Sequence, residues 1–201
     1  MALALRDELL RGGGVRVALT RADDRFLVLS DRNNIARRLG ADLFISIHAD
    51  STESGSSARG ATVYTLSERG SNETAERMAA RENAADAVNG VRLETQSATV
   101  NATLVDLSQR LANARSEEFA RLILREGEGK LPFRESAAQS GAFVVLKSPD
   151  VPSVLFESGY INNPDDLERL NSPAGRAAIA AVLAAAIRVH FARQAVPQIG
   201  T

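Results

Sequence analysis

The chain has 201 residues, with 24 Lys and Arg residues against 25 Asp and Glu residues, and its formal net charge at pH 7 is -1. This length suits one domain, and the balanced charge excludes the strongly cationic character that is typical of proteins binding nucleic acid or anionic membranes. The absence of Cys excludes disulfide bonds, thiolate metal sites and a cysteine nucleophile. No apolar run approaches the length of a membrane span, and the residues after Met1 follow a helical pattern rather than that of a signal peptide.

The first third of the sequence alternates between helical and strand patterns. A short helix is ended by the glycines at 12–14, and a second helix opens at Ser30 and ends at Gly40. Apolar and β-branched residues indicate strands between and after these helices. The predicted elements are helix 2–10, strand 15–20, helix 30–38, strand 43–48, loop 51–60 and strand 61–66. This order predicts an α/β layer fold.

The middle of the sequence, about 71–135, follows a different pattern. It contains no convincing strand, and it predicts one helix over 73–88 and a second over 103–126, separated by a weakly patterned polar stretch at 89–101. The region is too long for a crossover between strands and too polar at its centre for a core. We interpret 71–135 as a helical insertion, part of which lies on the surface of the sheet domain.

The last third of the sequence returns to the α/β pattern. Apolar runs predict strands over 142–146 and 151–157. Ser172-Pro173 is a strong helix start, because Pro is favoured at the first helical position, and the helix continues to about Arg193. The chain therefore predicts a single α/β domain over 1–201 that carries the insertion.

His48 stands at the carboxyl end of the apolar run that begins at Leu43. Ligands of α/β proteins bind at the carboxyl ends of strands, and a neutral imidazole is the commonest metal ligand and suits zinc. His48 is therefore a candidate metal ligand, with a structural histidine as the alternative. Asp50 is either a partner that orients the imidazole ring or a turn residue of the following loop.

Glu157 follows the apolar residues Val154, Leu155 and Phe156, which predict a buried backbone. A buried carboxylate without a partner is costly, so the simplest interpretation is a structural salt bridge. The functional alternative is a general base with a raised pKa that deprotonates a metal-bound water. One imidazole and one carboxylate at neighbouring strand ends are the components of a metal-assisted hydrolase.

His190 is the only other histidine, and it lies on the apolar stripe of the last predicted helix. We interpret it as a residue at the rim of the core. With one of two histidines structural, a zinc site cannot be built from imidazoles alone, so carboxylates must complete the ligand set.

Four motifs, in this order along the chain, resemble those of the zinc-dependent N-acetylmuramoyl-L-alanine amidases, and in particular the bacterial cell-division amidases. They are Ser46–Asp50, Gly60–Tyr64, Leu146–Pro152 and Phe156–Asn163. The resemblance extends over nearly the whole chain, from Leu3 to Phe191. The segment 80–86, followed by 104–111, also resembles the regulatory insertion of the division-associated branch.

The resemblance implies a three-layer α/β fold with a mostly parallel, twisted sheet flanked by helices, and one zinc ion in the domain. It implies hydrolysis of the amide between N-acetylmuramic acid and the L-alanine of the stem peptide, for daughter-cell separation in the periplasm. His48 matches a zinc ligand, and Glu157 matches the catalytic glutamate that activates water and protonates the leaving amine. Peptidoglycan and an activator protein of the division machinery are the implied partners.

The sequence departs from the family pattern at its amino-terminal end. The family carries two further zinc ligands, a His and a Glu, upstream of the helix that here starts at Ala2. We therefore expect this chain, taken alone, to retain zinc poorly and to be inactive. The alternative function is that of an inactive fragment or pseudoenzyme that binds peptidoglycan or a division partner. An unrelated α/β hydrolase is disfavoured, because no Gly-x-Ser-x-Gly elbow is present.

Glu82 is the candidate for a regulatory contact with the metal. In the division branch, a helix of the insertion covers the zinc until an activator displaces it. Glu82 lies in the middle of the predicted helix, with Asn83 and Asp86 on nearby turns. The alternative is a solvated helix face. If the chain itself retains zinc, Glu82 and Asp86 are the first candidates for the additional ligands.

Overall fold

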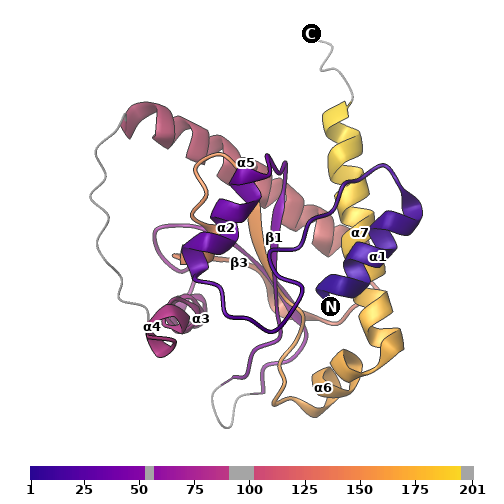
Figure 1. The fold of residues 1–201 in the computed structure, drawn as a ribbon. Coiled ribbons are helices and arrows are strands. Elements are labelled where there is room, and N and C mark those ends of the chain that lie inside the picture. Colours follow the sequence, from indigo (N-terminus) through magenta and orange to yellow (C-terminus); the bar gives the residue numbers. More distant parts are fainter. Residues whose placement is uncertain (53–56, 91–101, 196–201) are drawn as a thin grey trace.

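Figure 1 shows the computed structural model of the chain, which describes residues 1–52, 57–90 and 102–195. Helices and strands alternate through most of this length. The helices are α1 (Ala2–Gly12), α2 (Leu29–Arg38), α3 (Glu73–Asn83), α4 (Ala85–Val88), α5 (Ala102–Gly127), α6 (Pro164–Asn171) and α7 (Pro173–Ala195), and a 3-10 turn η1 spans Val144–Leu146. The strands are β1 (Phe44–His48), β2 (Ala61–Leu66), β3 (Phe133–Gly141) and β4 (Ser153–Glu157).

The four strands form one mixed sheet in the order β1-β4-β2-β3. The β1/β4 and β2/β3 pairs are parallel, and the β2/β4 pair is antiparallel, so the sheet is mostly parallel as expected. The β1/β4 register places His48 directly beside Glu157. The sheet thus brings the two sequence-predicted site residues to neighbouring strand ends.

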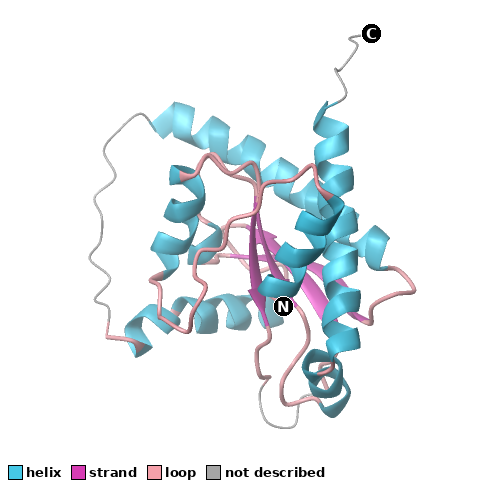
Figure 2. Ribbon diagram, turned by 45° about the vertical axis from the view of Figure 1, so that its right-hand side comes forward, coloured by secondary structure: helices cyan, strands magenta, loops and turns pink. Residues whose placement is uncertain are grey.

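Helices cover both faces of the sheet and produce the expected three layers (Figure 2). On one face, α1, α5 and α7 pack against strand residues that include Val63 and Phe156. On the other face, α2, α3 and η1 pack against Tyr64 and Leu155, the neighbours of those residues along the two strands. The alternation of side chains between the faces follows from the period of two of a β-strand.

The carboxyl-terminal helix α7 begins at Pro173, as the sequence predicts. By length and composition alone it could cross a membrane, so the expectation that no apolar run approaches that length is wrong for this helix. In this structure its side chains Ile179, Val182, Leu183 and Ile187 are buried in the core between α1 and α5. That environment accounts for its apolar composition as a core helix.

Two predicted strands are wrong. Residues 15–20 do not form a strand, and none of the described strands pairs with them. Their apolar side chains Val15 and Val17 nevertheless pack against the core. The apolar residues 144–146 form the η1 turn, in which Leu146 N–H donates to Phe143 O. Burial of these side chains does not require a strand.

The edge strand next to β2 is β3, which the sequence pattern does not reveal. Its residues 133–141 are mostly small and polar, because β3 pairs with β2 alone and only part of it is buried. β3 begins inside the region 71–135 that we expected to lack strands. The predicted helix 73–88 is also divided in two, at Ala84.

Helix α5 matches the predicted helix 103–126 closely. Its residues Phe119, Leu122 and Ile123 are buried in the core, so this part of 71–135 forms a layer of the domain. The shorter helices α3 and α4 lie at the other side of the sheet (Figure 1). The interpretation of 71–135 as an insertion stays a prediction.

Candidate metal and catalytic site

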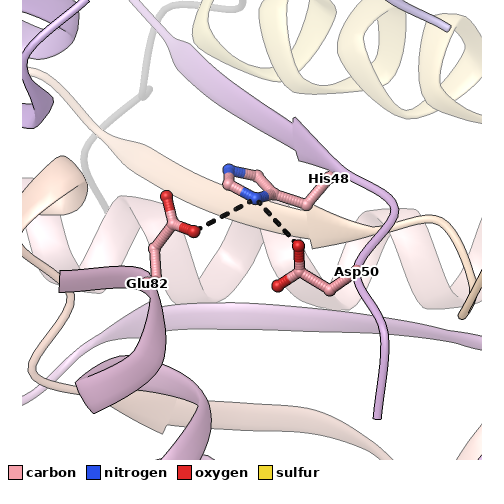
Figure 3. A group of neighbouring side chains, drawn as sticks. All are labelled: His48, Asp50 and Glu82. Atoms are coloured by element: carbon pink, nitrogen blue, oxygen red, sulfur yellow. Dashed lines mark ion pairs between the residues drawn. The ribbon is translucent and has the colours of Figure 1, made fainter. Parts of the chain in front are cut away.

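His48 ends β1 with its side chain largely covered, at 11% exposure. Its Nε2 lies 2.8 Å from Ser46 Oγ. Residues two apart on a strand share a face, so Ser46 can fix the orientation of the imidazole ring. This contact leaves Nδ1 facing two carboxylates (Figure 3).

Asp50 supplies the first of these carboxylates. Its Oδ1 lies 4.0 Å from His48 Nδ1, and its backbone N–H donates to Glu157 Oε1 at 2.9 Å. On its other side, Asp50 Oδ2 lies 3.9 Å from Arg81 Nη2. Asp50 therefore contacts both strand-end residues, which agrees better with a partner of His48 than with a simple turn residue.

Glu82 supplies the second carboxylate, and it comes from α3 rather than from the sheet (Figure 3). Its Oε2 lies 3.5 Å from His48 Nδ1, and its Oε1 lies 3.7 Å from Arg32 Nη1. The Glu82 side chain is only 10% exposed. This burial argues against the solvated helix face that was the alternative for Glu82.

The three residues form a donor set that fits zinc. One ligand atom each from His48, Asp50 and Glu82 lies within 4.8 Å of the other two. An imidazole nitrogen and carboxylate oxygens are zinc ligands, and two carboxylates beside one imidazole form a site that attracts a cation. Among the described residues these are the groups that could hold the metal.

Glu157 is fully buried at the end of β4. Its Oε1 accepts the Asp50 N–H, whereas its Oε2 has no hydrogen-bond partner among the described residues. Burial, reinforced by the negative charges of Asp50 and Glu82 and opposed by the Asp50 N–H, raises the pKa of Glu157 to about 9. A buried carboxyl with one unused oxygen and a raised pKa is suited to proton transfer. No buried salt bridge to Glu157 is found in the described part of the chain.

Hydrogen bonds join the loops that follow β1 and β4. Ser158 N–H donates to His48 O, Ile161 N–H donates to Asp50 O, and the Asn162 carboxamide pairs with Thr52. These contacts hold the two strand ends in register beyond the sheet. The segment predicted as a loop at 51–60 includes residues 53–56, which lie outside the described residues.

The segment 82–86 is fixed to the domain by polar side chains. The Asn83 carboxamide donates to Ala142 O and accepts from Val144 N–H, both at 2.8 Å. Asp86 is buried and accepts from Leu29 N–H, where it caps the start of α2. The Asp86 carboxylate is therefore occupied by its hydrogen bond to α2, and it is not part of the donor set around His48.

Sequence reasoning missed Arg32, and it named Asn83 only as a neighbour of Glu82, without its contacts to Ala142 and Val144. Their partners lie about 50 and 60 residues away along the chain, so no local pattern marks either contact. His190, in contrast, is where it was expected. It is buried, and its ring contacts the rings of Phe119 and Phe191.

Residues 1–189 match the protein family described as N-acetylmuramoyl-L-alanine amidase. The chain is 39% identical over 184 residues to N-acetylmuramoyl-L-alanine amidase AmiA of Escherichia coli (strain K12), a match that covers 91% of this chain and 63% of AmiA. It is 33% identical over 194 residues to N-acetylmuramoyl-L-alanine amidase AmiC of Escherichia coli O6:H1, covering 96% of this chain and 46% of AmiC. The chain thus spans less than two thirds of the length of these relatives.

Two solved structures have the same fold. One is the catalytic domain of CwlV, an N-acetylmuramoyl-L-alanine amidase from Bacillus (Paenibacillus) polymyxa var. colistinus, with a TM-score of 0.66 at 23% identity over 95% of this chain and 80% of that one. The other is Ami1 from Mycobacterium smegmatis, with a TM-score of 0.65 at 22% identity over 96% of this chain and 74% of that one. These likenesses agree with the three-layer arrangement described above.

Proposed function

This chain belongs to the N-acetylmuramoyl-L-alanine amidase family, and from that premise we propose that it hydrolyses the amide between N-acetylmuramic acid and the L-alanine of the peptidoglycan stem peptide. The observation that carries the proposal is the pairing of His48 and Glu157 at adjacent strand ends, joined through Asp50. A metal ligand and a buried proton carrier at one sheet edge are what amide hydrolysis by activated water requires.

We propose that His48 is a zinc ligand and that Asp50 and Glu82 are the described carboxylates that complete its surroundings. The expectation that this chain alone retains zinc poorly and is inactive stays a prediction, and zinc is therefore supplied in the tests below. Bound zinc would polarise the scissile carbonyl, acidify a water molecule and, by its positive charge, lower the pKa of the nearby Glu157. Ser46 holds the His48 ring so that Nδ1 faces the carboxylates.

We propose that Glu157 acts as the general base and then as the general acid. The Asp50 N–H holds Oε1 in place, and Oε2 is left to take a proton from the attacking water. The same oxygen then returns the proton to the nitrogen of the departing L-alanine. Because Glu157 is fully buried, the proton it carries is not readily lost to bulk solvent.

We propose that Glu82 keeps the site closed until a partner protein removes α3. Its carboxylate stands beside His48, where a substrate carbonyl would have to approach. The family and the relatives AmiA and AmiC support peptidoglycan as substrate. The resemblance of the sequence motifs to the cell-division amidases supports a role in daughter-cell separation, with an activator protein as partner and the periplasm as location.

A second candidate function is a non-catalytic one, in which the chain binds peptidoglycan or a division partner. Occupation of the cluster by Glu82 favours it, because a permanently covered site does no chemistry. The two functions differ in whether Glu157 matters for peptide release.

The test is release of stem peptides from purified cell-wall sacculi by the zinc-supplied protein, followed by mass spectrometry of the products. Glu157→Gln should lower the rate by about 10²- to 10⁴-fold, because general acid–base catalysis is lost. Glu168→Gln, at an exposed position on α6, is the matched control and should leave the rate unchanged. Equal, enzyme-dependent release by both variants would refute the role of Glu157, and no release by any form, Glu82→Ala included, would favour the binding function.

A further inference from the structure

Arg32 is a covered cation beside the candidate site. It lies in the first turn of α2, and its side chain is only 15% exposed. Its Nε donates to Leu27 O at 3.1 Å, which anchors the base of the guanidinium. Its Nη1 lies 3.7 Å from Glu82 Oε1.

Glu82 is the one carboxylate within ion-pair distance of Arg32 among the residues that the structure describes. Asp86, the next acid along the same segment, directs both carboxylate oxygens to Leu29 N–H, at 3.0 and 3.3 Å. The nearest counter-charge of Arg32 is therefore a group that belongs to α3 and that also contacts His48, and Asp86 adds a weaker attraction.

A single carboxylate thus lies between Arg32 and the zinc-ligand candidate. One oxygen of Glu82 faces Arg32 Nη1, and the other faces His48 Nδ1 at 3.5 Å. If α3 moves away, the position held by this carboxylate opens, and Arg32, still anchored through Nε to Leu27 O, loses its nearest counter-ion. A guanidinium forms strong charge-assisted hydrogen bonds with carboxylates, so another carboxylate would be drawn to the same position.

We propose that Arg32 binds a free carboxylate of the stem peptide, in the position that the Glu82 carboxylate holds in this structure. The inference rests on the proposed function. In many stem peptides the residue after L-alanine carries such a carboxylate, so the leaving peptide has an acidic group close to the scissile amide. Arg32 then determines specificity for acidic stem peptides, and Glu82 competes with the substrate for it.

The test is a binding measurement that does not depend on turnover. The probes are the dipeptides L-alanyl-D-isoglutamate, which has the free carboxylate, and L-alanyl-D-isoglutamine, in which it is a neutral amide. Isothermal titration calorimetry on Glu82→Ala should give about 10- to 100-fold tighter binding of the acidic dipeptide, the range expected of a hydrogen bond to a charged group. The wild type should bind the acidic dipeptide more weakly than Glu82→Ala, because Glu82 competes.

Substitutions of Arg32 in the Glu82→Ala variant test whether Arg32 causes the preference for the acidic dipeptide over the neutral one. Arg32→Gln should abolish it, Arg32→Lys should keep part of it, and Arg38→Gln, at an exposed position on the same helix, should keep all of it. Equal affinity of Glu82→Ala for the two dipeptides would overturn the proposal, and this comparison needs no change at Arg32. Release of stem peptides from sacculi reports separately on the amidase activity, so failure of either proposal is recognisable by itself.

Discussion

The two halves of the candidate site are held in the structure by different means. His48 and Glu157 stand at the ends of paired strands whose side chains fill the core, and a loop network continues their register. Glu82 stands on the helix α3, which is held by its buried residues Ala75, Met78 and Ala79 and by the side chains of Asn83 and Asp86. We infer that the strand half is the more firmly held and that α3 is the cover that can be released, because α3 buries fewer and mostly smaller side chains than the paired strands.

The largest loss of stability should come from a substitution in the strand half of the site, which is β1 and β4 with His48 and Glu157. Phe156, directly before Glu157, is fully buried, and Phe156→Ala should lower the free energy of unfolding by about 3–5 kcal/mol. Phe26→Ala, at a position that is 37% exposed, is the matched control and should cost much less. Urea unfolding measures both, and similar losses in the two variants would mean that the strand half is no more firmly held than the surface.

A smaller and more local effect should come from Asn83→Ala. The substitution leaves Ala142 O and Val144 N–H without a side-chain partner, at a cost of about 1–3 kcal/mol. Hydrogen exchange should therefore speed up in residues 73–88 and stay slow in β1 and β4, and basal amidase activity should rise. Asn89→Ala, which removes only a contact to Ala85 within the same segment, is the control. Exchange that speeds up equally throughout the sheet would contradict a detachable cover.

The smallest effect concerns the pH dependence of the free energy of unfolding, through the buried residue His190. Burial, with a contribution from Arg115 and against the charge of Glu118, lowers the pKa of His190 below its usual value of 6.5. Unfolded chains therefore take up a proton at His190 before folded chains do, and the free energy of unfolding falls as the pH drops below about 6.5. His190→Phe should weaken this loss between pH 7 and pH 5 in thermal unfolding, and an unchanged pH profile would contradict the assignment.

Sequence reasoning located the strand half because its signal is local. The apolar runs before His48 and Glu157 predict buried strands, and both strands are present with the two residues at neighbouring ends. It failed where structure depends on distant partners. Residues 15–20 have a strand pattern but no paired strand, and β3 is a strand with little apolar pattern because it pairs on one side only.

The contacts of Glu82 on α3 were also beyond sequence reasoning, because they depend on residues far away along the chain. Glu82 could be proposed from a family resemblance, but the contact between Arg32 and Glu82 joins two helices far apart in the sequence, and neither residue has a pattern that points to the other. Asp86 was a candidate ligand on sequence grounds, and it caps α2 instead. A carboxylate on a helix has the same appearance in a sequence whether it caps a neighbour or faces a metal.

The central claim, that His48 holds the metal while Glu157 moves the proton, is tested most directly by measuring zinc and activity on the same samples. The wild type, His48→Ala and Glu157→Gln are equilibrated with zinc, dialysed and analysed for bound zinc and for stem-peptide release from sacculi. The account predicts that Glu157→Gln keeps the zinc of the wild type without its activity, whereas His48→Ala loses both. Retention of wild-type zinc by His48→Ala, or of wild-type activity by Glu157→Gln, would contradict it.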